Sequence, residues 1–324
     1  MYRAAIQAAG HEGVLESANG ELFIKPKTNQ QELDFYNDIS SRPDLEDMQL
    51  ITPLFMGTLT EQEAQTEEGK VKDYDMLMEQ VGVKEGKIKE LVKPSSENVE
   101  SGSVSLVLQN MMHGFREPNV IDIKLGSVLW DDSASEEKRE RLDEVSRTTT
   151  SGSLSLRIAG MNLYDPKTKE RTFYDKTFGR SIETSRVVDG FKTYFPASME
   201  EEKARALCEG ITEELKYILQ TMERMEVRMK SASIMIIYEA DPEAFDEKLE
   251  KGNAAVENTN RKTEQGEEED SEDEDNHVQP LYIVKLIDFA RSKYTPRQGH
   301  DENSLTGIRN LIDIFQKLEH IYSE

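Results

Sequence analysis

Apolar residues recur with a helical period over two long stretches in the second half of the chain. In the first stretch they are Ala204, Leu207, Cys208, Ile211, Leu215, Ile218, Met222 and Met225. In the second stretch, within residues 304–322, they are Leu305, Ile308, Leu311, Ile312, Phe315 and Leu318. A stripe on one face is typical of a helix that packs against a core. We therefore expect two long core helices in this half.

Shorter apolar runs, bounded by turn residues, predict strands. Near the start, the Asn19-Gly20 turn predicts a hairpin that leads into a strand at 21–25, followed by a helix at 30–37 and a buried strand at 103–109. A further helix is expected at 135–147, because Ser135 can cap its first turn. The other predicted strands are 118–126, 154–161, 171–175, 233–238 and 281–287.

These elements predict an α+β protein with two lobes and a cleft between them. Residues 1–110 form a small, sheet-rich first lobe, and residues 111–324 form a larger, mixed second lobe. Residues 61–101 are charged and lack a long apolar stripe, which predicts a solvent-facing elaboration of the first lobe. Residues 241–279 are mostly polar and predict a disordered acidic insertion in the second lobe.

The chain is strongly acidic, which limits the partners that it can bind. It carries a net charge of −24, and nine acidic residues between Glu264 and Asp275 leave −15 for the rest. This surplus argues against direct binding of nucleic acid through a basic face. An anionic substrate must then be bound by a local cluster of lysine and arginine.

Cysteine and histidine usage excludes two further classes of protein. The single cysteine, Cys208, cannot form an internal disulfide framework, and the five scattered histidines offer no zinc-site spacing. No secretion signal and no apolar run of about 18 residues for a membrane span is present. We expect a monomer located in the nucleus and the cytoplasm.

Residues 118–126, Pro-Asn-Val-Ile-Asp-Ile-Lys-Leu-Gly, carry the most informative chemistry. Asp122 and Lys124 lie at strand period, so both charges leave the same face of the expected strand. Such a pair suits phosphoryl transfer, because the carboxylate can orient a hydroxyl and the ammonium can hold phosphate oxygens. Taken alone, the pair could equally be a surface ion pair.

This segment resembles the signature Pro-x-x-x-Asp-x-Lys-x-Gly of the inositol polyphosphate kinase family. Pro118, Asp122, Lys124 and Gly126 fill its four fixed positions. Further segments resemble the family in the expected order, from about residue 7 to residue 322. They are the glycine-containing loop 7–13, the segments 23–26 and 32–36 around the nucleotide lysine and first helix, the serine-leucine motif 149–154, and the metal-binding turn 287–290.

The resemblance implies a protein-kinase-like fold with ATP bound in the cleft between the lobes. Backbone groups of Gln109 and Met111 would meet the adenine, although the family more usually has Glu at position 109. Lys25, paired with Glu32, would reach the phosphates, and Asp288 would bind Mg²⁺. Without the resemblance, the residues alone favour an ordinary exposed lysine at position 25 and a turn or cap residue at Asp288. Gly10 and Gly13 would let the backbone approach the phosphates.

For the acceptor, the resemblance implies binding of a soluble inositol polyphosphate by four basic residues, which are Lys124, Lys138, Arg141 and Arg291. Lys138 and Arg141 lie three residues apart, hence on one helix face, which could instead be a solvated face. Arg291 stands where related multikinases often have His. The serine-leucine motif would shape the rear of the site, although Ser155 stands where the family usually has Gly.

The expected reaction transfers phosphoryl groups from ATP to inositol trisphosphate and tetrakisphosphate, with Asp122 and Lys124 as the catalytic pair. The chain resembles most the multikinase branch of the family, particularly its fungal form. One alternative is a kinase of inositol hexakisphosphate. Another is a nuclear scaffold for transcription complexes, in which Glu264 to Asp275 binds basic transcription-factor proteins.

Overall fold

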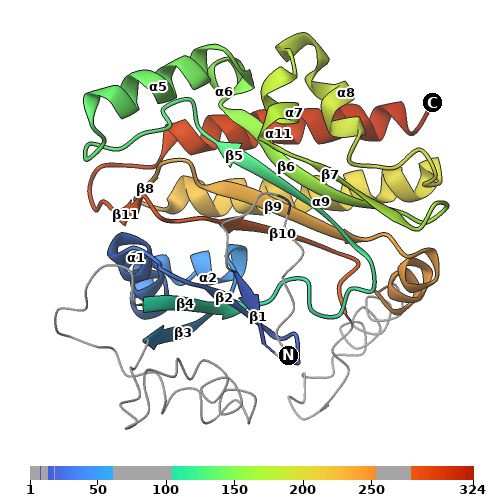
Figure 1. Ribbon diagram of the computed structural model, residues 1–324, viewed down its shortest axis with the longest axis horizontal. Helices are drawn as coiled ribbons and strands as arrows, with labels where there is room; N and C mark the ends of the chain where they lie inside the picture. Colours follow the sequence, from blue (N-terminus) through green and yellow to red (C-terminus); the bar gives the residue numbers. More distant parts are fainter. Residues whose placement is uncertain (1–7, 9–13, 18, 61–103, 253–278) are drawn as a thin grey trace, which may run out of the picture.

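The computed structural model describes residues 8, 14–17, 19–60, 104–252 and 279–324. Within these residues the strands form a four-stranded, a five-stranded and a two-stranded sheet. In Figure 1 the four-stranded sheet lies below the five-stranded sheet. Most of the helices that follow residue 130 lie above the five-stranded sheet. The predicted boundary at residue 110 falls between β4 and β5, which belong to different sheets. None of the helices that the structure describes is long and apolar enough to span a membrane.

The four-stranded sheet has the order β1-β2-β4-β3 and is antiparallel throughout. A turn at Gly20, with φ of 78°, joins β1 to β2, so the predicted hairpin is confirmed. The expected helix at 30–37 is also confirmed and continues for one more turn. The elements are β1 (Leu15–Glu16), β2 (Leu22–Lys25), α1 (Gln30–Ser41), η1 (Pro43–Leu45), α2 (Met48–Ile51), β3 (Phe55–Thr60) and β4 (Val104–Gln109).

The five-stranded sheet has the order β10-β9-β5-β6-β7, again antiparallel, with β5 at its centre. The strands predicted at 233–238 and 281–287 are confirmed as β9 and β10, and the structure shows that they pair as antiparallel neighbours. The five strands are β5 (Pro118–Leu125), β6 (Leu156–Asp165), β7 (Glu170–Tyr174), β9 (Ser233–Glu239) and β10 (Tyr282–Ile287). The separate pair is β8 (Val227–Met229) and β11 (Ser292–Tyr294).

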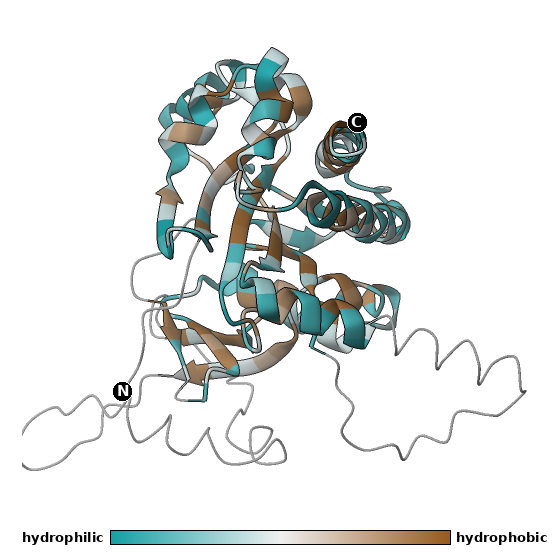
Figure 2. Cartoon of the chain, turned by 90° about the vertical axis from the view of Figure 1, so that its right-hand side faces the viewer, coloured by the Kyte–Doolittle hydropathy of each residue, from teal (hydrophilic) through white to brown (hydrophobic). Residues whose placement is uncertain are grey.

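Helices α9 and α11 are the two long core helices that the apolar stripes predict. Their stripes are buried, and the helices pack against each other and against the five-stranded sheet. Figure 2 shows both nearly end-on beside the hydrophobic strands. Met225 lies just beyond α9 but is still buried. The helices of this part are α5 (Glu136–Arg147), α6 (Thr150–Leu154), α7 (Lys176–Ser181), η2 (Thr184–Arg186), α8 (Val187–Lys192), α9 (Glu201–Arg224) and α11 (Glu302–Ile321), together with a helical segment at 242–252.

Strand β5 presents two different faces. Ile121, Ile123 and Leu125 belong to the main hydrophobic core. Asp122 and Lys124 leave the opposite face, as their spacing predicts, and Val120 shares this face in a smaller apolar cluster. Because both faces are covered, an acid and a base are carried on a strand that is almost entirely buried.

Two expectations about element boundaries were wrong. The strand expected from Leu154 begins at Leu156, because residues 150–154 form α6, which ends at Ser155 in the left-handed region with φ of 53°. The insertion expected to be disordered from residue 241 is helical at 242–252, where Ala244, Phe245 and Lys248 are buried. The acidic tract at 264–275, Gly10, Gly13 and the elaboration at 61–101 lie outside the described residues, so these expectations stay predictions.

A close approach between α11 and the end of α6 yields a stability prediction. A Cβ atom at Gly307 would lie 2.2 Å from the backbone oxygen of Ser155. We expect Gly307→Ala to lower the free energy of unfolding by about 1–3 kcal/mol, because the overpacking outweighs the gain in helix propensity. Urea denaturation measures the change, with Gln316→Ala at an exposed position of α11 as the control. A Gly307→Ala protein as stable as the unmodified one would contradict the packing.

Candidate active site

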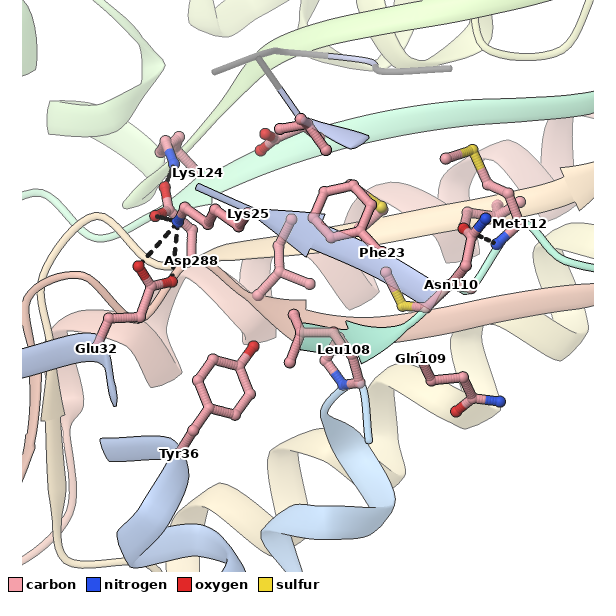
Figure 3. A pocket seen from close by; sticks show the side chains of 17 residues that line it. Phe23, Lys25, Glu32, Tyr36, Leu108, Gln109, Asn110, Met112, Lys124 and Asp288 are labelled. Carbon is pink, nitrogen blue, oxygen red and sulfur yellow. Dashed lines mark hydrogen bonds and ion pairs between the residues drawn. The ribbon is translucent and has the colours of Figure 1, made fainter. Parts of the chain in front are cut away.

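A pocket of about 280 Å³ lies between the four-stranded and five-stranded sheets. Both sheets, α1 and the connector after β4 contribute to its walls. Figure 3 shows charged side chains at one end of the pocket and the connector at the other. Among its lining residues are Lys25, Glu32, Gln109, Met111, Asp122, Lys124 and Asp288. The structure therefore brings together seven residues that the sequence singles out from segments far apart in the chain.

Lys25 is held at the charged end by Glu32. The Lys25 Nζ atom lies 2.9 Å from both carboxylate oxygens of Glu32, and Glu32 is buried in the first turn of α1. Asn29 caps this turn by accepting a hydrogen bond from the Glu32 backbone N–H at 2.8 Å. The Lys25 side chain is only 14% exposed, so the reading of Lys25 as an ordinary surface lysine is wrong.

Asp288 joins the two sheets through lysines from each. It follows β10 directly, and its backbone lies in the left-handed region with φ of 63°. Its carboxylate lies 3.4 Å from the Lys25 Nζ atom and forms an ion pair with Lys124. A positive φ at a residue other than glycine is uncommon, although Asp tolerates it better than most. The strained turn therefore aims the carboxylate into the pocket.

Asp122 lies beside this ion pair and is only 5% exposed. Burial raises the pKa of Asp122 above its ordinary value, although the Lys124 charge and a hydrogen bond from Ser233 oppose the rise. Its Oδ1 atom is buried and has no hydrogen-bond partner. A buried acceptor without a partner is costly, so this oxygen is prepared for a donor that a ligand would supply. The alternative of a surface ion pair is excluded.

Lys124 is held at the same end by groups on two neighbouring elements. Its Nζ atom donates to the Ser233 hydroxyl at 3.0 Å as well as pairing with Asp288. Burial alone would lower the pKa of Lys124, but the carboxylates of Asp288 and Asp122 outweigh it and raise the pKa above its ordinary value. Lys124 therefore carries its charge at neutral pH.

Gly126 ends the motif for a reason that the structure makes clear. Its φ is 93°, and a Cβ atom there would lie 2.2 Å from the side-chain amide nitrogen (Nδ2) of Asn303. Asn303 accepts hydrogen bonds from the backbone N–H groups of Ser127 and Val128, at 3.0 and 2.9 Å. The glycine thus lets the chain leave β5 sharply and close against α11.

The connector forms the other end of the pocket, where Met111 and Gln109 were expected to meet a nucleotide base. Both line the pocket, but Gln109 is exposed, and its side chain points away from the cavity in Figure 3. The Gln109 backbone N–H donates to the Leu54 oxygen at 2.9 Å. A contact of Gln109 with a ligand would therefore use its carbonyl.

Of the four basic residues expected to bind an acceptor, Lys124 lines this pocket and the other three lie outside its lining. Arg291 is held beside Asp131, with 3.6 Å between its Nε atom and the carboxylate. Burial opposes ionisation of Asp131, but hydrogen bonds from Ser133 and the charges of Arg291 and Lys138 lower its pKa below the ordinary value. Arg291 and Lys138 thus share a neighbour, whereas Arg141 is exposed on α5.

Two polar residues next to Lys124, both outside the lining of the pocket, escaped the sequence reasoning. Arg157 lies opposite Lys124 on β6, is 8% exposed, and donates to the Ser151 hydroxyl at 2.7 Å. Its Nε atom is buried without a partner, and burial lowers its pKa. Ser233 contacts Lys124 as described above. A charged residue within an apolar strand was the available signal for Arg157, whereas nothing local marked Ser233.

The residues that the structure describes could hold a divalent cation together with phosphates of a bound ligand. Among the described residues, no three His, Cys, Asp or Glu side chains cluster closely enough to hold a metal ion. Asp288 supplies one carboxylate in the charged end of the pocket, beside two lysines that favour phosphate oxygens. Mg²⁺ is commonly bound by one or two carboxylates together with substrate phosphates, so the donor set fits.

Comparison with known proteins identifies relatives over nearly the whole chain. Residues 105–316 match the family model of inositol polyphosphate kinase. The chain is 33% identical to the inositol polyphosphate multikinase of Saccharomyces cerevisiae, over 96% of each chain. It is 27% identical to inositol hexakisphosphate kinase 3 of Mus musculus, over 66% of this chain and 50% of the relative.

A solved structure supports the same relationship. The crystal structure of the inositol phosphate multikinase of S. cerevisiae in complex with ADP and Mn²⁺ aligns with a TM-score of 0.64 and 32% identity. The alignment covers 92% of this chain and 99% of that chain. The described strands and helices therefore have the two-lobed, kinase-like arrangement that was expected.

The burial of Asp122 predicts how stability depends on pH. Because the folded-state pKa of Asp122 is raised, the folded protein binds its proton more tightly than the unfolded chain does. The contribution of Asp122 to stability is therefore present at low pH and is lost as pH rises through the folded-state pKa. We expect the unfolding free energy of the unmodified protein, minus that of Asp122→Asn, to fall as the pH rises above about 4, the ordinary pKa of an aspartate.

Chemical denaturation of both proteins across this pH range gives the difference directly, and contributions of distant groups cancel in the subtraction. At pH 7 the variant should be at least as stable as the unmodified protein. A difference that rises with pH, or a loss of more than about 1 kcal/mol in the variant at pH 7, would contradict this account of Asp122.

Proposed function

The chain belongs to the inositol polyphosphate kinase family, and we propose that it phosphorylates inositol trisphosphate and tetrakisphosphate, with ATP as the donor, to tetrakis- and pentakisphosphate. The observation that carries this proposal is the arrangement around Asp122. A buried carboxylate oxygen without a partner lies beside a charged lysine, in a pocket whose other end is apolar. This arrangement fits an acceptor hydroxyl placed next to a phosphoryl group.

The pocket fits ATP in one orientation. Its apolar end, at the connector, suits a base, and its charged end suits the phosphates, with Lys25 fixed by Glu32. Because the protein as a whole is acidic, such a local pair of lysines is what makes binding of a polyanion favourable. The related S. cerevisiae protein was solved with ADP and Mn²⁺, which supports a nucleotide and a divalent cation here.

Asp288 is the residue that we propose to hold the cation, with Mg²⁺ as the physiological ion. A divalent cation beside the donor phosphates neutralises the charge that develops during phosphoryl transfer. In the structure Asp288 is paired with Lys25 and Lys124. Binding of phosphates would give both lysines new partners, so the carboxylate would become available to the cation as the nucleotide binds.

Asp122 would accept a hydrogen bond from the acceptor hydroxyl and take its proton as the new oxygen–phosphorus bond forms. In the same step the bond between the γ-phosphorus and the bridging oxygen of ATP breaks, and ADP leaves. The raised pKa of Asp122 suits this role, because a base works best when its pKa approaches the working pH. Lys124, charged and held by Ser233, would stabilise the oxygens of the transferred group.

The phosphates of the acceptor need cations beyond Lys124. Arg157 is the first candidate for this role. Its buried Nε atom lacks a partner, and the guanidinium of arginine can donate two parallel hydrogen bonds to a phosphate. We propose that Arg291 and Lys138 contribute from the neighbouring rim beside Asp131. We assign the outermost contact with the acceptor to Arg141, which is exposed on α5.

The multikinase branch is favoured over the hexakisphosphate kinase branch by the extent of the likeness. The multikinase relative matches 96% of both chains, whereas the hexakisphosphate kinase relative matches 66% of this chain and half of its own length. The acidic tract that suggested a transcriptional scaffold lies outside the described residues. Its proposed partner class is basic transcription-factor proteins.

A direct assay tests the proposal. The purified protein is incubated with ATP, Mg²⁺ and inositol trisphosphate, and the products are resolved by chromatography. We expect tetrakis- and pentakisphosphate from the unmodified protein. Asp288→Ala should lose about 10²-fold or more in rate, because it removes the carboxylate beside the donor phosphates. Asp189→Asn, at an exposed position away from the pocket, is the matched control and should retain full activity.

The pattern of products also decides between the branches. Consumption of inositol hexakisphosphate without reaction of the trisphosphate would move the chain to the hexakisphosphate kinases. Full activity of Asp288→Ala would remove Asp288 from the mechanism.

A further inference from the structure

The connector between the two sheets, defined here as residues 110–117, is anchored to the first sheet at its beginning. The Asn110 backbone N–H donates to the Glu21 oxygen at 2.7 Å, and its side-chain amide donates to the Gly20 oxygen at 2.8 Å. These bonds tie the connector to the β1–β2 hairpin.

The far end of the connector is anchored by Glu239, a fully buried carboxylate at the end of β9. Its oxygens accept hydrogen bonds from the backbone N–H groups of Arg116, at 2.8 Å, and Glu117, at 2.9 Å. A third backbone donor, Asp241, lies at 3.1 Å. Three donors to one carboxylate make a strong, directional attachment, because hydrogen bonds to a charged group are about twice as strong as neutral ones.

Lys248 completes this anchor from the helical segment 242–252. Its Nζ atom lies 3.4 Å from Glu239 and donates to the Gly114 oxygen at 2.9 Å and the Pro280 oxygen at 3.3 Å. The ammonium also lies 3.9 Å from the centre of the Phe115 ring, which is within the range of a cation–π contact. The Lys248 side chain is only 10% exposed.

The connector carries the wall of the pocket between these two anchors. Met111 and Met112 line the pocket, and both pack with Phe115 against the apolar cluster of Val120 and Ile237. In Figure 3, Asn110 and Met112 lie at the opposite end of the pocket from Lys124 and Asp288. A change in the far anchor would therefore move the wall near the base and leave the charged end in place.

We propose that Lys248 is a positioning residue for the nucleotide: together with Glu239 it fixes the connector and so sets the affinity for ATP without taking part in phosphoryl transfer. This inference rests on the proposed binding of ATP in the pocket. The helical segment 242–252, which was expected to belong to the disordered insertion, would then contribute to nucleotide binding through Lys248.

The test compares Lys248→Met with Lys251→Met, which changes an exposed lysine on the same helical segment. Methionine keeps the apolar stem of Lys248 and removes its charge, while Glu239 keeps its three backbone donors. We expect Lys248→Met to raise the Kd for an ATP analogue, measured by calorimetry, and the KM for ATP by about three- to tenfold. The kcat and the KM for inositol trisphosphate should stay within about twofold. Lys251→Met should match the unmodified protein in all four values.

A purely structural role of Lys248 would give a different result. Partial unfolding would lower the apparent kcat through loss of active protein and leave the Kd and both KM values unchanged. That outcome, or a folded Lys248→Met protein with unchanged affinity for ATP, would overturn the inference. If Lys248→Met does not fold, Phe115→Leu, which removes the ring contact, should raise the KM for ATP by a smaller factor, and no change would overturn the inference. Absence of ATP-dependent activity in the unmodified protein would instead count against the proposed function.

Discussion

The rest of the site depends on the ion pairs that the Asp288 carboxylate forms with Lys25 and Lys124. Lys25 comes from the four-stranded sheet and Lys124 from the five-stranded sheet, so one carboxylate links both halves of the molecule. The protein has an excess of acidic residues, yet its proposed substrates are polyanions. The site meets both requirements, because the Glu32 and Asp288 carboxylates balance the charges of Lys25 and Lys124 in the free protein. Both lysines can then bind phosphate oxygens when a nucleotide arrives.

Each member of this cluster is held by a second residue, and burial makes that support necessary. Glu32 fixes Lys25, and Ser233 fixes Lys124. Asp122 and Arg157 have buried polar atoms without partners, which reduces the stability of the free protein. Both residues lie beside Lys124, and this position, together with the unsatisfied atoms, is where we propose that the acceptor binds. The Glu239–Lys248 anchor follows the same logic at the apolar end, where it fixes backbone instead of a ligand.

Local patterns in the sequence predicted much of the fold and part of the site. The period of apolar residues identified α9 and α11, and strand alternation placed Asp122 and Lys124 on one face of β5. The resemblance to a family added Lys25, Glu32 and Asp288. Ser233 and Lys248 could not be found in this way, because their roles arise from contacts between segments far apart in the chain. Arg157 did offer a local signal, a charged residue within an apolar strand, but the sequence reasoning did not use it. The helix at 242–252 was missed because its polar composition concealed three buried residues.

The most direct test of the account is the coupling between nucleotide and divalent cation at Asp288. Calorimetric titration of an ATP analogue, with and without Mg²⁺, is compared between the unmodified protein and Asp288→Asn. The account predicts that Mg²⁺ tightens binding of the analogue to the unmodified protein by about tenfold or more, and that the variant loses most of this dependence. An equal effect of Mg²⁺ on both proteins would contradict the role assigned to Asp288.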